Sequence, residues 1–334
     1  MEKQLTLIID KIINEIGQVQ VLGADDKVIT DVTADSRVVQ EGSLFICLKG
    51  ATVDGHKFLK MAVEKGAVAA LVEDVPEEIP AGVTLLVVPD TRKAMEAIVP
   101  FFFDYPGKNM RMLGITGTNG KTTTTNIIRT VLRKAGYKVG LIGTINIMIE
   151  DEAVEAHNTT PDVVDLQKAL FAMKNAGCDY VVMEVSSHAL VLNRVAGCEY
   201  DCAVLSNITQ DHLDFHKTLE NYRDAKSLLF EGLANGVKEN KNAVFNMDDA
   251  SSEIIKARTK VNCLTYGKEH TNDIYPISFN VQAKEMQLKL ATPVGEMDLD
   301  LKITGEFNVY NVMSAVACLL AEKIDKEIKN YENL

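Results

Sequence analysis

Three closely spaced glycines, Gly114, Gly117 and Gly120, precede a lysine and a run of threonines in the segment LGITGTNGKTTTT. Glycines at such spacing let backbone N–H groups approach an anion closely, and a helix that starts after them adds the positive end of its dipole. Lys121 supplies a point charge for phosphate groups, and the hydroxyl of Thr122 is suited to bind Mg²⁺. The segment therefore predicts a phosphate-binding loop between a strand and a helix.

The loop departs from the strict Walker spacing, because Ile115 stands where that pattern has its first glycine. Its own spacing is G-x-x-G-x-x-G-K-T. The alternative interpretation is a tight strand-to-helix turn with a solvated lysine, and the combination of glycines, lysine and following helix favours nucleotide binding over it. The loop alone does not separate kinases, GTPases, ATPases and ligases, because all of them hold phosphates in this way.

An acidic residue, Glu184, ends the apolar run YVVME. A carboxylate at the end of a parallel strand emerges at the sheet edge where open α/β folds bind ligands, so Glu184 is a candidate Mg²⁺ ligand. The alternative for this residue is a strand-end acid that faces water. A second apolar run, AVLSN, leads into a polar cluster of further possible metal ligands: Asn207, Asp211, His212, Asp214 and His216.

For two residues the pattern alone favours a structural role. An isolated histidine is more often structural than a metal ligand, and we expect this for His216. Lys226 lies in NYRDAKSLLF, an amphipathic helix pattern in which Tyr222, Leu229 and Phe230 are available for burial. The pattern therefore predicts an ordinary solvated helix lysine at this position.

Two kinds of segment must position these residues. From Val21 to about Pro106, short β-like runs alternate with the helical pattern HKFLKMAVEKGA, which predicts a small α/β domain. The segment DYPGKNM is expected to be a linker. After it, strand and helix patterns alternate for well over a hundred residues, which predicts a mainly parallel sheet wrapped by helices.

The later segments have their own boundaries. We expect a helix that is capped by Thr160, has Pro161 in its first turn and stops at Gly177. Beyond Asn262 the pattern changes to alternating strands, and a final helix is predicted from about Asn308.

Composition bounds the class of protein. The chain has 334 residues, 35 basic and 47 acidic side chains and a net charge of −12, with 46% apolar and 25% charged residues. Such a chain is globular and long enough for about two domains at roughly 150 residues each. The acidic balance gives no general attraction to nucleic acid or anionic lipid, so we expect small anions as partners.

The cellular location follows from what the sequence contains. The first residues, MEKQLTLIID, fit neither a secretory signal nor a transit peptide, so the chain is expected to be cytoplasmic. The densest apolar stretches fall far short of the ~18 residues of a membrane span. The six cysteines include no C-x-x-C pair and lie mostly in apolar runs, which predicts buried reduced thiols.

Taken together, the motifs resemble the Mur ligases of peptidoglycan synthesis, and among them the MurE type. The resemblance implies a small N-terminal α/β UDP-binding domain over residues 1–105 and a P-loop ATPase-like central domain over 106–334, with a mainly parallel sheet and a small antiparallel β section. It extends over nearly the whole chain in blocks that follow the family order: TADSR (33–37), KGATVDGHKF (49–58), GTNGKTT (117–123), NTTPD (158–162), MEVSSHAL (183–190), SNITQDHLDFH (206–216), YRDAKSLLF (222–230) and GEFNVYN (305–311).

The same resemblance implies roles for individual residues. ATP would be held by Gly117, Thr118, Asn119, Gly120, Lys121, Thr122, Thr123, Asn308 and Asn311. The UDP group would be contacted by Ser36, Ala51, Thr52 and Val53, and the muramoyl dipeptide by Asn158, Thr159, Thr160, Ser186 and Arg194. Mg²⁺ would be bound by Thr122, Glu184, His212 and Lys226, the last matching a lysine that CO₂ carbamylates in the family. Lys121, Glu184, His212 and Lys226 would be the catalytic residues. Leu192 stands where some members have glutamine, so one polar substrate contact is missing.

The implied activity is an ATP-dependent amide-bond ligase. ATP would phosphorylate the D-glutamate carboxylate of UDP-N-acetylmuramoyl-L-Ala-D-Glu, and the amine of L-lysine or meso-diaminopimelate would attack the acyl phosphate. A monomer is expected, with no nucleic-acid or membrane partner. Family members carry a further C-terminal domain, so the chain ending at Leu334 predicts a truncated ligase that binds its substrates but forms the amide weakly or not at all.

Two alternatives remain open at this point. The first is a folylpolyglutamate synthase-like ligase with a similar phosphate loop, although the folate enzymes lack the N-terminal domain that carries TADSR. The second is a catalytically incomplete protein that binds UDP-sugars or ATP. The presence of Lys121, Glu184, His212 and Lys226 argues against loss of catalysis.

Overall fold

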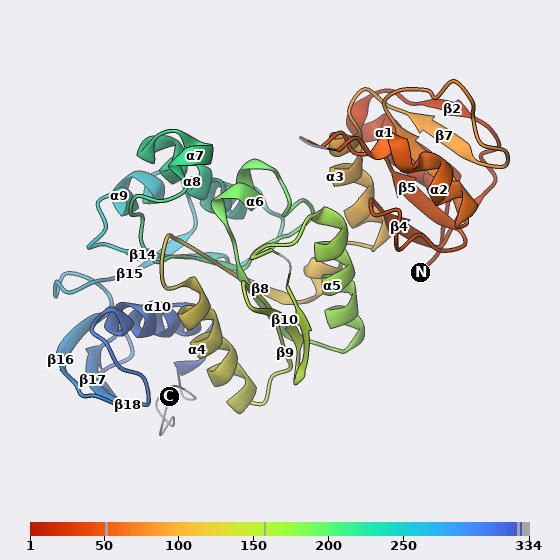
Figure 1. Ribbon diagram of the computed structural model, residues 1–334. Helices are drawn as coiled ribbons and strands as arrows, with labels where there is room; N and C mark the ends of the chain where they lie inside the picture. Colours follow the sequence, from red (N-terminus) through yellow and green to blue (C-terminus); the bar gives the residue numbers. More distant parts are fainter. Residues whose placement is uncertain (51–52, 157, 326–327, 329–334) are drawn as a thin grey trace. The chain divides into compact units, whose positions relative to one another are not determined.

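The computed structural model describes residues 1–50, 53–156, 158–325 and 328 (Figure 1). The chain divides into two compact units. Unit 1 consists of Met1–Pro106, Asp162–Phe171 and Asn193–Gly197, and unit 2 consists of Gly107–Pro161, Ala172–Leu192 and Cys198–Leu334. Two short segments from the middle of the chain thus belong to the unit built by the N-terminal residues.

Unit 1 is built on a five-stranded sheet in the order β2-β7-β6-β5-β4. Its last four strands are parallel and β2 is antiparallel to β7. The apolar faces of α1 and α3 pack together over one side of this sheet, and Ile8, Ile12 and Ile98 are fully buried there. The elements of this unit are β1 (Lys3–Gln4), α1 (Leu5–Ile16), β2 (Gln20–Leu22), β3 (Val28–Ile29), β4 (Asp31–Thr33), β5 (Ser43–Ile46), the 3₁₀ turn η1 (Gly55–Phe58), α2 (Leu59–Glu64), β6 (Ala67–Val72), β7 (Thr84–Val87) and α3 (Thr91–Phe102).

Unit 2 is built on an eight-stranded sheet in the order β11-β10-β9-β12-β8-β13-β14-β15. The six strands from β9 to β15 in this order are parallel, and β10 and β11 form an antiparallel edge. The strands are β8 (Arg111–Thr116), β9 (Val139–Ile142), β10 (Asn146–Ile149), β11 (Glu152–Glu155), β12 (Tyr180–Glu184), β13 (Cys202–Leu205), β14 (Asn242–Asn246) and β15 (Asn262–Tyr266).

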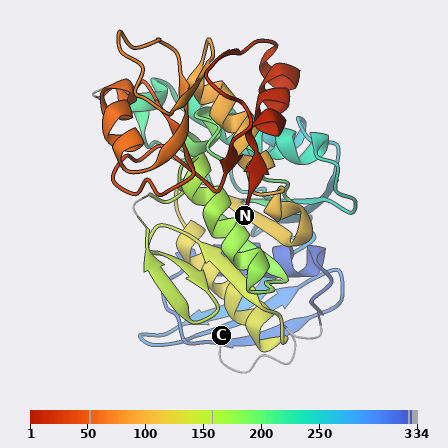
Figure 2. The ribbon, with the colours of Figure 1, turned by 90° about the vertical axis from the view of Figure 1, so that its right-hand side faces the viewer.

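Helices cover both faces of this sheet (Figures 1 and 2). Leu113 and Ile115 of β8 face the cluster that holds α4 and α10, whereas the intervening Gly114 faces Tyr200 and Leu229, the latter on α8. Burial on both sides explains why these strands are continuous apolar runs rather than alternating ones. The helices of the unit are α4 (Lys121–Lys134), α6 (Ser187–Val191), α7 (Leu213–His216), α8 (Leu219–Asn235), α9 (Ser251–Lys256) and α10 (Phe307–Ala321), and the 3₁₀ turn η2 (Pro106–Asn109) precedes β8. The helix α5 (Val163–Asn175) belongs to unit 1 as far as Phe171 and to unit 2 from Ala172.

A small antiparallel sheet completes unit 2. It has the order β16-β17-β18, formed by β16 (Tyr275–Val281), β17 (Met286–Ala291) and β18 (Met297–Leu301). Its inward residues, among them Leu288 and Leu299, share one core with α10. The predicted α/β class, with a mainly parallel sheet and a small antiparallel section, is therefore confirmed, although the antiparallel strands begin at Tyr275 because the strand at Asn262 pairs in parallel with β14.

The predicted cap of α5 is wrong. The carboxylate of Asp162 accepts a hydrogen bond from the backbone N–H of Val163, and Pro161 lies before the helix. The hydroxyl of Thr160 is engaged elsewhere, because it donates to the carbonyl oxygen of Glu184. The predicted stop is confirmed: Gly177 has a φ of +77° and its N–H donates to the carbonyl of Lys174.

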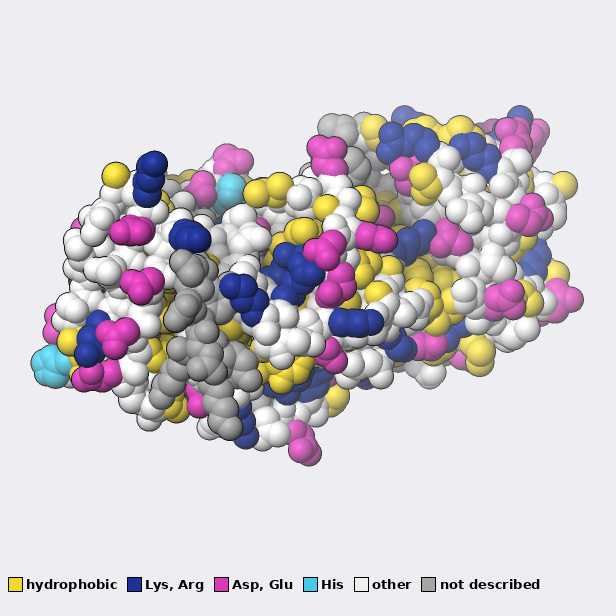
Figure 3. Space-filling view, turned by 90° about the horizontal axis from the view of Figure 1, so that it is seen from below, with side chains coloured by type: hydrophobic (Ala, Val, Ile, Leu, Met, Phe, Trp, Pro, Cys, Tyr) yellow, Lys and Arg dark blue, Asp and Glu magenta, His cyan; other side chains and the backbone are white. Residues whose placement is uncertain are grey.

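Two further expectations concern thiols and membrane spans. All six cysteines are free thiols; four are buried, while Cys198 and Cys263 are half-buried. None of the helices in the described part of the chain is long and apolar enough to cross a membrane. On the face drawn in Figure 3, basic and acidic side chains are interspersed rather than segregated by sign.

Candidate active site

The glycine-rich loop joins β8 to α4, as its spacing predicts. Gly117 and Gly120 both have positive φ values, 146° and 89°. A Cβ on Gly117 would collide with the hydroxyl of Ser206, and one on Gly120 would collide with the side-chain oxygen of Asn311. The two glycines are thus required by backbone conformation and by close packing at once.

Lys121, the first residue of α4, folds back over the loop. Its Nζ donates to the carbonyl oxygens of Gly117 (2.8 Å) and Thr118 (2.9 Å). Burial lowers the pKa of Lys121, while the charges of Glu184 and Asp211 oppose that shift. The ammonium group therefore lies at the loop and the N-terminus of a helix, where an anionic phosphate would be stabilised.

The segment after β13 braces the loop. The carbonyl of Asn207 accepts from Thr118 N–H (2.8 Å), and its side-chain oxygen accepts from Asn119 N–H (2.9 Å). The hydroxyl of Thr118 bonds to Thr209 and to the Tyr222 hydroxyl. Asn207, which the sequence singles out as a possible metal ligand, has a clear role in shaping the phosphate loop.

Glu184 ends β12, and its side chain is 1% exposed. One carboxylate oxygen, Oε1, accepts from the Thr122 hydroxyl (3.0 Å) and from Thr144 N–H (3.1 Å), and Oε2 accepts from the Thr144 hydroxyl (3.0 Å). A Cβ on Gly143 would lie 2.5 Å from Oε1, so any other residue at this position would displace the carboxylate. The sequence analysis missed Gly143 and Thr144, although the strand-end position of GLIGT was a usable signal.

These donors suit Mg²⁺. Mg²⁺ prefers oxygen ligands, and proteins usually supply only one or two of them. Phosphates and water complete the octahedron, so a buried carboxylate next to a threonine hydroxyl at a phosphate loop is a suitable protein contribution. Within the described residues, no group of three or more His, Cys, Asp or Glu side chains is arranged to hold a metal. Thr122 and Glu184 would therefore need oxygens from the nucleotide to complete the coordination.

The two histidines near α7, His212 and His216, differ in burial. His216 is buried, and its Nε2 shares a hydrogen bond with the Ser187 hydroxyl (2.9 Å), which fits the expected structural role. His212 is exposed, has a left-handed backbone with φ of 52°, and lies 3.5 Å from the Asp211 carboxylate. Asp214 is an exposed residue of the first turn of α7.

The expectation of a solvated Lys226 is wrong. Its side chain is 1% exposed; Nζ donates to the Gly117 carbonyl (2.9 Å) and lies 4.5 Å from the centre of the Tyr222 ring. Burial and the nearby positive charge of Lys121 hold the pKa of Lys226 well below its usual value. Lys226 and Lys121 thus share the Gly117 carbonyl as an acceptor, which brings the amine of Lys226 to the glycine-rich loop.

A cavity of about 630 Å³ adjoins the phosphate loop. Asn311 lines it, and its Nδ2 donates to the side-chain oxygen of Asn308 (2.7 Å). The Nδ2 of Asn308 in turn donates to the Thr304 carbonyl (2.7 Å). Phe307 lies on the rim and is 69% exposed. The remaining lining residues are Asn119, Gly120, Thr123, Asn207, Thr209, Asn246, Asp248, Asp249 and Tyr310.

The other substrate candidates fall in both units. In unit 1, Ser36 is buried, Val53 is exposed and Arg194 is half-buried, while Ala51 and Thr52 lie outside the described residues. The candidates of unit 2 differ in exposure: Asn158 is exposed, Thr159 and Ser186 are half-buried and Thr160 is buried. The buried Thr160 hydroxyl donates to Glu184 O and accepts from Ser186 N–H, so it fixes the turn after β12.

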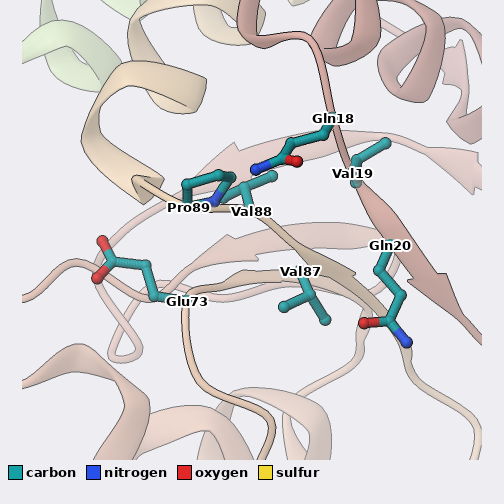
Figure 4. A pocket seen from close by; sticks show the side chains of 7 residues that line it. All are labelled: Gln18, Val19, Gln20, Glu73, Val87, Val88 and Pro89. Carbon is teal, nitrogen blue, oxygen red and sulfur yellow. The ribbon is translucent and has the colours of Figure 1, made fainter.

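Unit 1 also has a hollow of about 500 Å³ (Figure 4). Gln18, Gln20 and Glu73 line it together with apolar side chains. Both oxygens of Glu73 are occupied, by Thr91 and by the Lys49 ammonium. The Lys49 ammonium is therefore paired with Glu73 and is not free to bind a phosphate in this hollow.

Comparison with known proteins decides the family. The family model described as Mur ligase middle domain matches residues 115–319, which is more than half of the chain, and the model described as Mur ligase family, catalytic domain, matches residues 28–102. The chain belongs to the Mur ligase family. The predicted family resemblance is thereby confirmed.

Individual proteins agree with this assignment. A UDP-N-acetylmuramoyl-L-alanyl-D-glutamate--2,6-diaminopimelate ligase from Geobacillus thermodenitrificans is 47% identical over 295 residues, which cover 88% of this chain and 60% of that protein. A solved structure of an enzyme of the same name matches 98% of this Mur ligase chain and 66% of its own, at 27% identity and a TM-score of 0.79. Folylpolyglutamate synthetase from Lactobacillus casei shares the fold over 70% of this chain and 65% of its own, at 16% identity and a TM-score of 0.52. The chain spans about three fifths of the length of the curated relatives it matches.

Proposed function

We propose that the chain carries the nucleotide-binding and precursor-binding parts of an acid–amino-acid ligase of peptidoglycan precursor synthesis. The observation that carries the proposal is the pairing of Thr122 with Glu184, 3.0 Å apart, beside Lys121 at a glycine-rich loop. Relatives at 44–47% identity carry the name of a 2,6-diaminopimelate ligase. Their name supports UDP-N-acetylmuramoyl-L-Ala-D-Glu as the acceptor and 2,6-diaminopimelate, rather than L-lysine, as the incoming amine.

The chemistry needs charge to be neutralised where a phosphoryl group moves. A D-glutamate carboxylate oxygen attacks the γ-phosphorus of ATP, ADP leaves, and the amine then displaces phosphate from the acyl phosphate to form the amide. Lys121 and the N–H groups at the start of α4 are suited to hold the transferred phosphoryl group. Bound Mg²⁺, held by Thr122 and Glu184 with His212 and a carbamylated Lys226 as further proposed ligands, would supply countercharge to the phosphates.

The two predicted domains, residues 1–105 and 106–334, take different nucleotides in this proposal. Residues 1–105 bind the uridine nucleotide through Ser36 and the segment 51–53, and residues 106–334 bind ATP, with Asn308 and Asn311 near the adenine. Asn158, Thr159, Ser186 and Arg194 contact the muramoyl dipeptide, and Thr160 supports them from the buried position described above. The protein acts as a monomer in the cytoplasm, where ATP is available.

Calorimetric titration tests the choice of substrate. We expect UDP-N-acetylmuramoyl-L-Ala-D-Glu to bind saturably in the presence of Mg²⁺ and a non-hydrolysable ATP analogue, with a Kd below about 1 mM, the upper end of usual substrate affinities. UDP-N-acetylglucosamine, which shares only the UDP and sugar parts, should bind more weakly. Preferential binding of a reduced folate, or no binding of either ligand, would contradict the proposal.

A further inference from the structure

A chain of hydroxyl groups connects a candidate substrate segment to the candidate metal ligand. The Thr144 hydroxyl bonds to the Thr159 hydroxyl (3.1 Å) and to Oε2 of Glu184 (3.0 Å). Thr159 belongs to the NTTPD segment, and the next residue, Thr160, bonds to the backbone of Glu184. The same short segment is therefore connected to the Glu184 carboxylate through the Thr144 hydroxyl and to the Glu184 backbone through the Thr160 hydroxyl.

Proton counting limits what the Thr144 hydroxyl can do. It is the donor to two acceptors, the Thr159 hydroxyl and Oε2 of Glu184. A hydroxyl group carries one hydrogen, so the two acceptors share it. Any ligand that changes the position of the Thr159 hydroxyl therefore changes how fully Thr144 donates to Glu184.

We propose that Thr144 is a positioning residue that orients the Glu184 carboxylate for Mg²⁺ and couples that orientation to the segment around Thr159. The inference rests on the proposed function and deepens it, because it joins the substrate segment to the magnesium site. Thr144 holds both carboxylate oxygens, with its N–H on Oε1 and its hydroxyl on Oε2. This leaves the Thr122 hydroxyl as the third donor to the same carboxylate.

Linkage gives the inference a measurable consequence. If Thr144 orients the metal ligand, removing its hydroxyl weakens Mg²⁺ binding and leaves metal-free nucleotide binding unchanged. Partners that orient a metal ligand typically contribute about 10–100-fold in metal affinity. Coupling between two sites is also reciprocal. A change at Thr159 that alters the Thr144 hydroxyl should therefore alter the affinity for Mg²⁺.

The experiment measures the affinity of the 334-residue chain for a non-hydrolysable ATP analogue by calorimetry, over a series of Mg²⁺ concentrations and with EDTA. Thr144→Val is expected to raise the half-saturating Mg²⁺ concentration about tenfold and to leave the affinity in EDTA unchanged. Thr144→Ser, which restores a hydroxyl, should return the Mg²⁺ response to that of the original chain. Thr130→Val is the matched control, because Thr130 is exposed and its hydroxyl donates to Asn126 O of its own helix, away from Glu184.

A double substitution tests the relay itself. Thr159→Val removes the acceptor that competes with Glu184 for the Thr144 hydrogen. It should therefore lower the half-saturating Mg²⁺ concentration in the original chain and have no further effect once Thr144 is valine. Additive effects, an unchanged Mg²⁺ response in Thr144→Val, or equal losses with Mg²⁺ and with EDTA would overturn the inference. If the original chain binds no nucleotide at all, both the proposed function and the inference fail. If the original chain binds nucleotide and the variants respond to Mg²⁺ as it does, only the inference fails.

Discussion

Lys121→Ala is expected to reduce the affinity for a non-hydrolysable ATP analogue at least about 100-fold. Hydrogen bonds from a charged group contribute about 1.5–3 kcal/mol each, and the ammonium group has two acceptors in the loop that phosphate oxygens would replace. Lys121→Arg should restore little of the affinity, because a planar guanidinium does not fit a site shaped for a compact ammonium group. Calorimetry with Mg²⁺ present measures the loss.

The matched control for this substitution is Lys260→Ala. Lys260 is exposed in the segment that precedes β15, so its removal alters net charge equally without touching the loop. We expect nucleotide affinity within about twofold of the original chain for this control. Equal affinities of the Lys121 and Lys260 variants would show that the loop lysine does not contact the nucleotide.

Lys226→Met is expected to change how stability depends on pH. The folded-state pKa of Lys226 lies well below the unfolded value of about 10.4, so the native state binds fewer protons than the unfolded state between those two values. The stability of the original chain relative to the variant should therefore rise with pH through that window, at up to about 1.4 kcal/mol per pH unit. Urea denaturation of both chains from pH 7 to 9.5, in buffer freed of CO₂, measures the difference.

The effect of bicarbonate on stability gives a second comparison of the original chain with Lys226→Met. A neutral amine combines with CO₂ to give a carbamate and one released proton, and a buried lysine with a lowered pKa is the amine suited to do so at neutral pH. Bicarbonate should therefore stabilise the original chain by mass action and leave Lys226→Met unaffected. Parallel stability curves for the two chains across pH would refute the lowered pKa of Lys226. Lys260→Met serves as the exposed-lysine control.

Local patterns predicted much of the architecture. The glycine spacing, the continuous apolar strands and the alternating run after Tyr275 each depend on neighbouring residues, so the phosphate loop, the parallel sheet and the antiparallel section could be inferred from the sequence. The strand-end position of Glu184 was also accessible, because strand length and polarity fix where such a residue emerges.

Other features depend on contacts between distant parts of the chain. Lys226 lies on the helix face that also buries Tyr222 and Leu229, and helical periodicity does not reveal that its amine reaches Gly117, 109 residues earlier. Thr160 resembled a helix cap because the local pattern does not show that its hydroxyl donates to the carbonyl oxygen of Glu184. The position of Thr144 at the end of a strand was visible in the pattern GLIGT, but its hydrogen bond to Glu184, 40 residues later, was not.

The most direct test of the account is photolabelling with 8-azido-ATP followed by peptide mapping. We propose that nucleotide phosphates occupy the loop at Gly117–Lys121 while the base enters the adjoining cavity. Adducts are therefore predicted in the segments 246–249 and 307–311, with labelling suppressed by excess ATP and by Lys121→Ala. Adducts in the unit 1 hollow around Gln18 and Gln20, or labelling that excess ATP does not suppress, would contradict it.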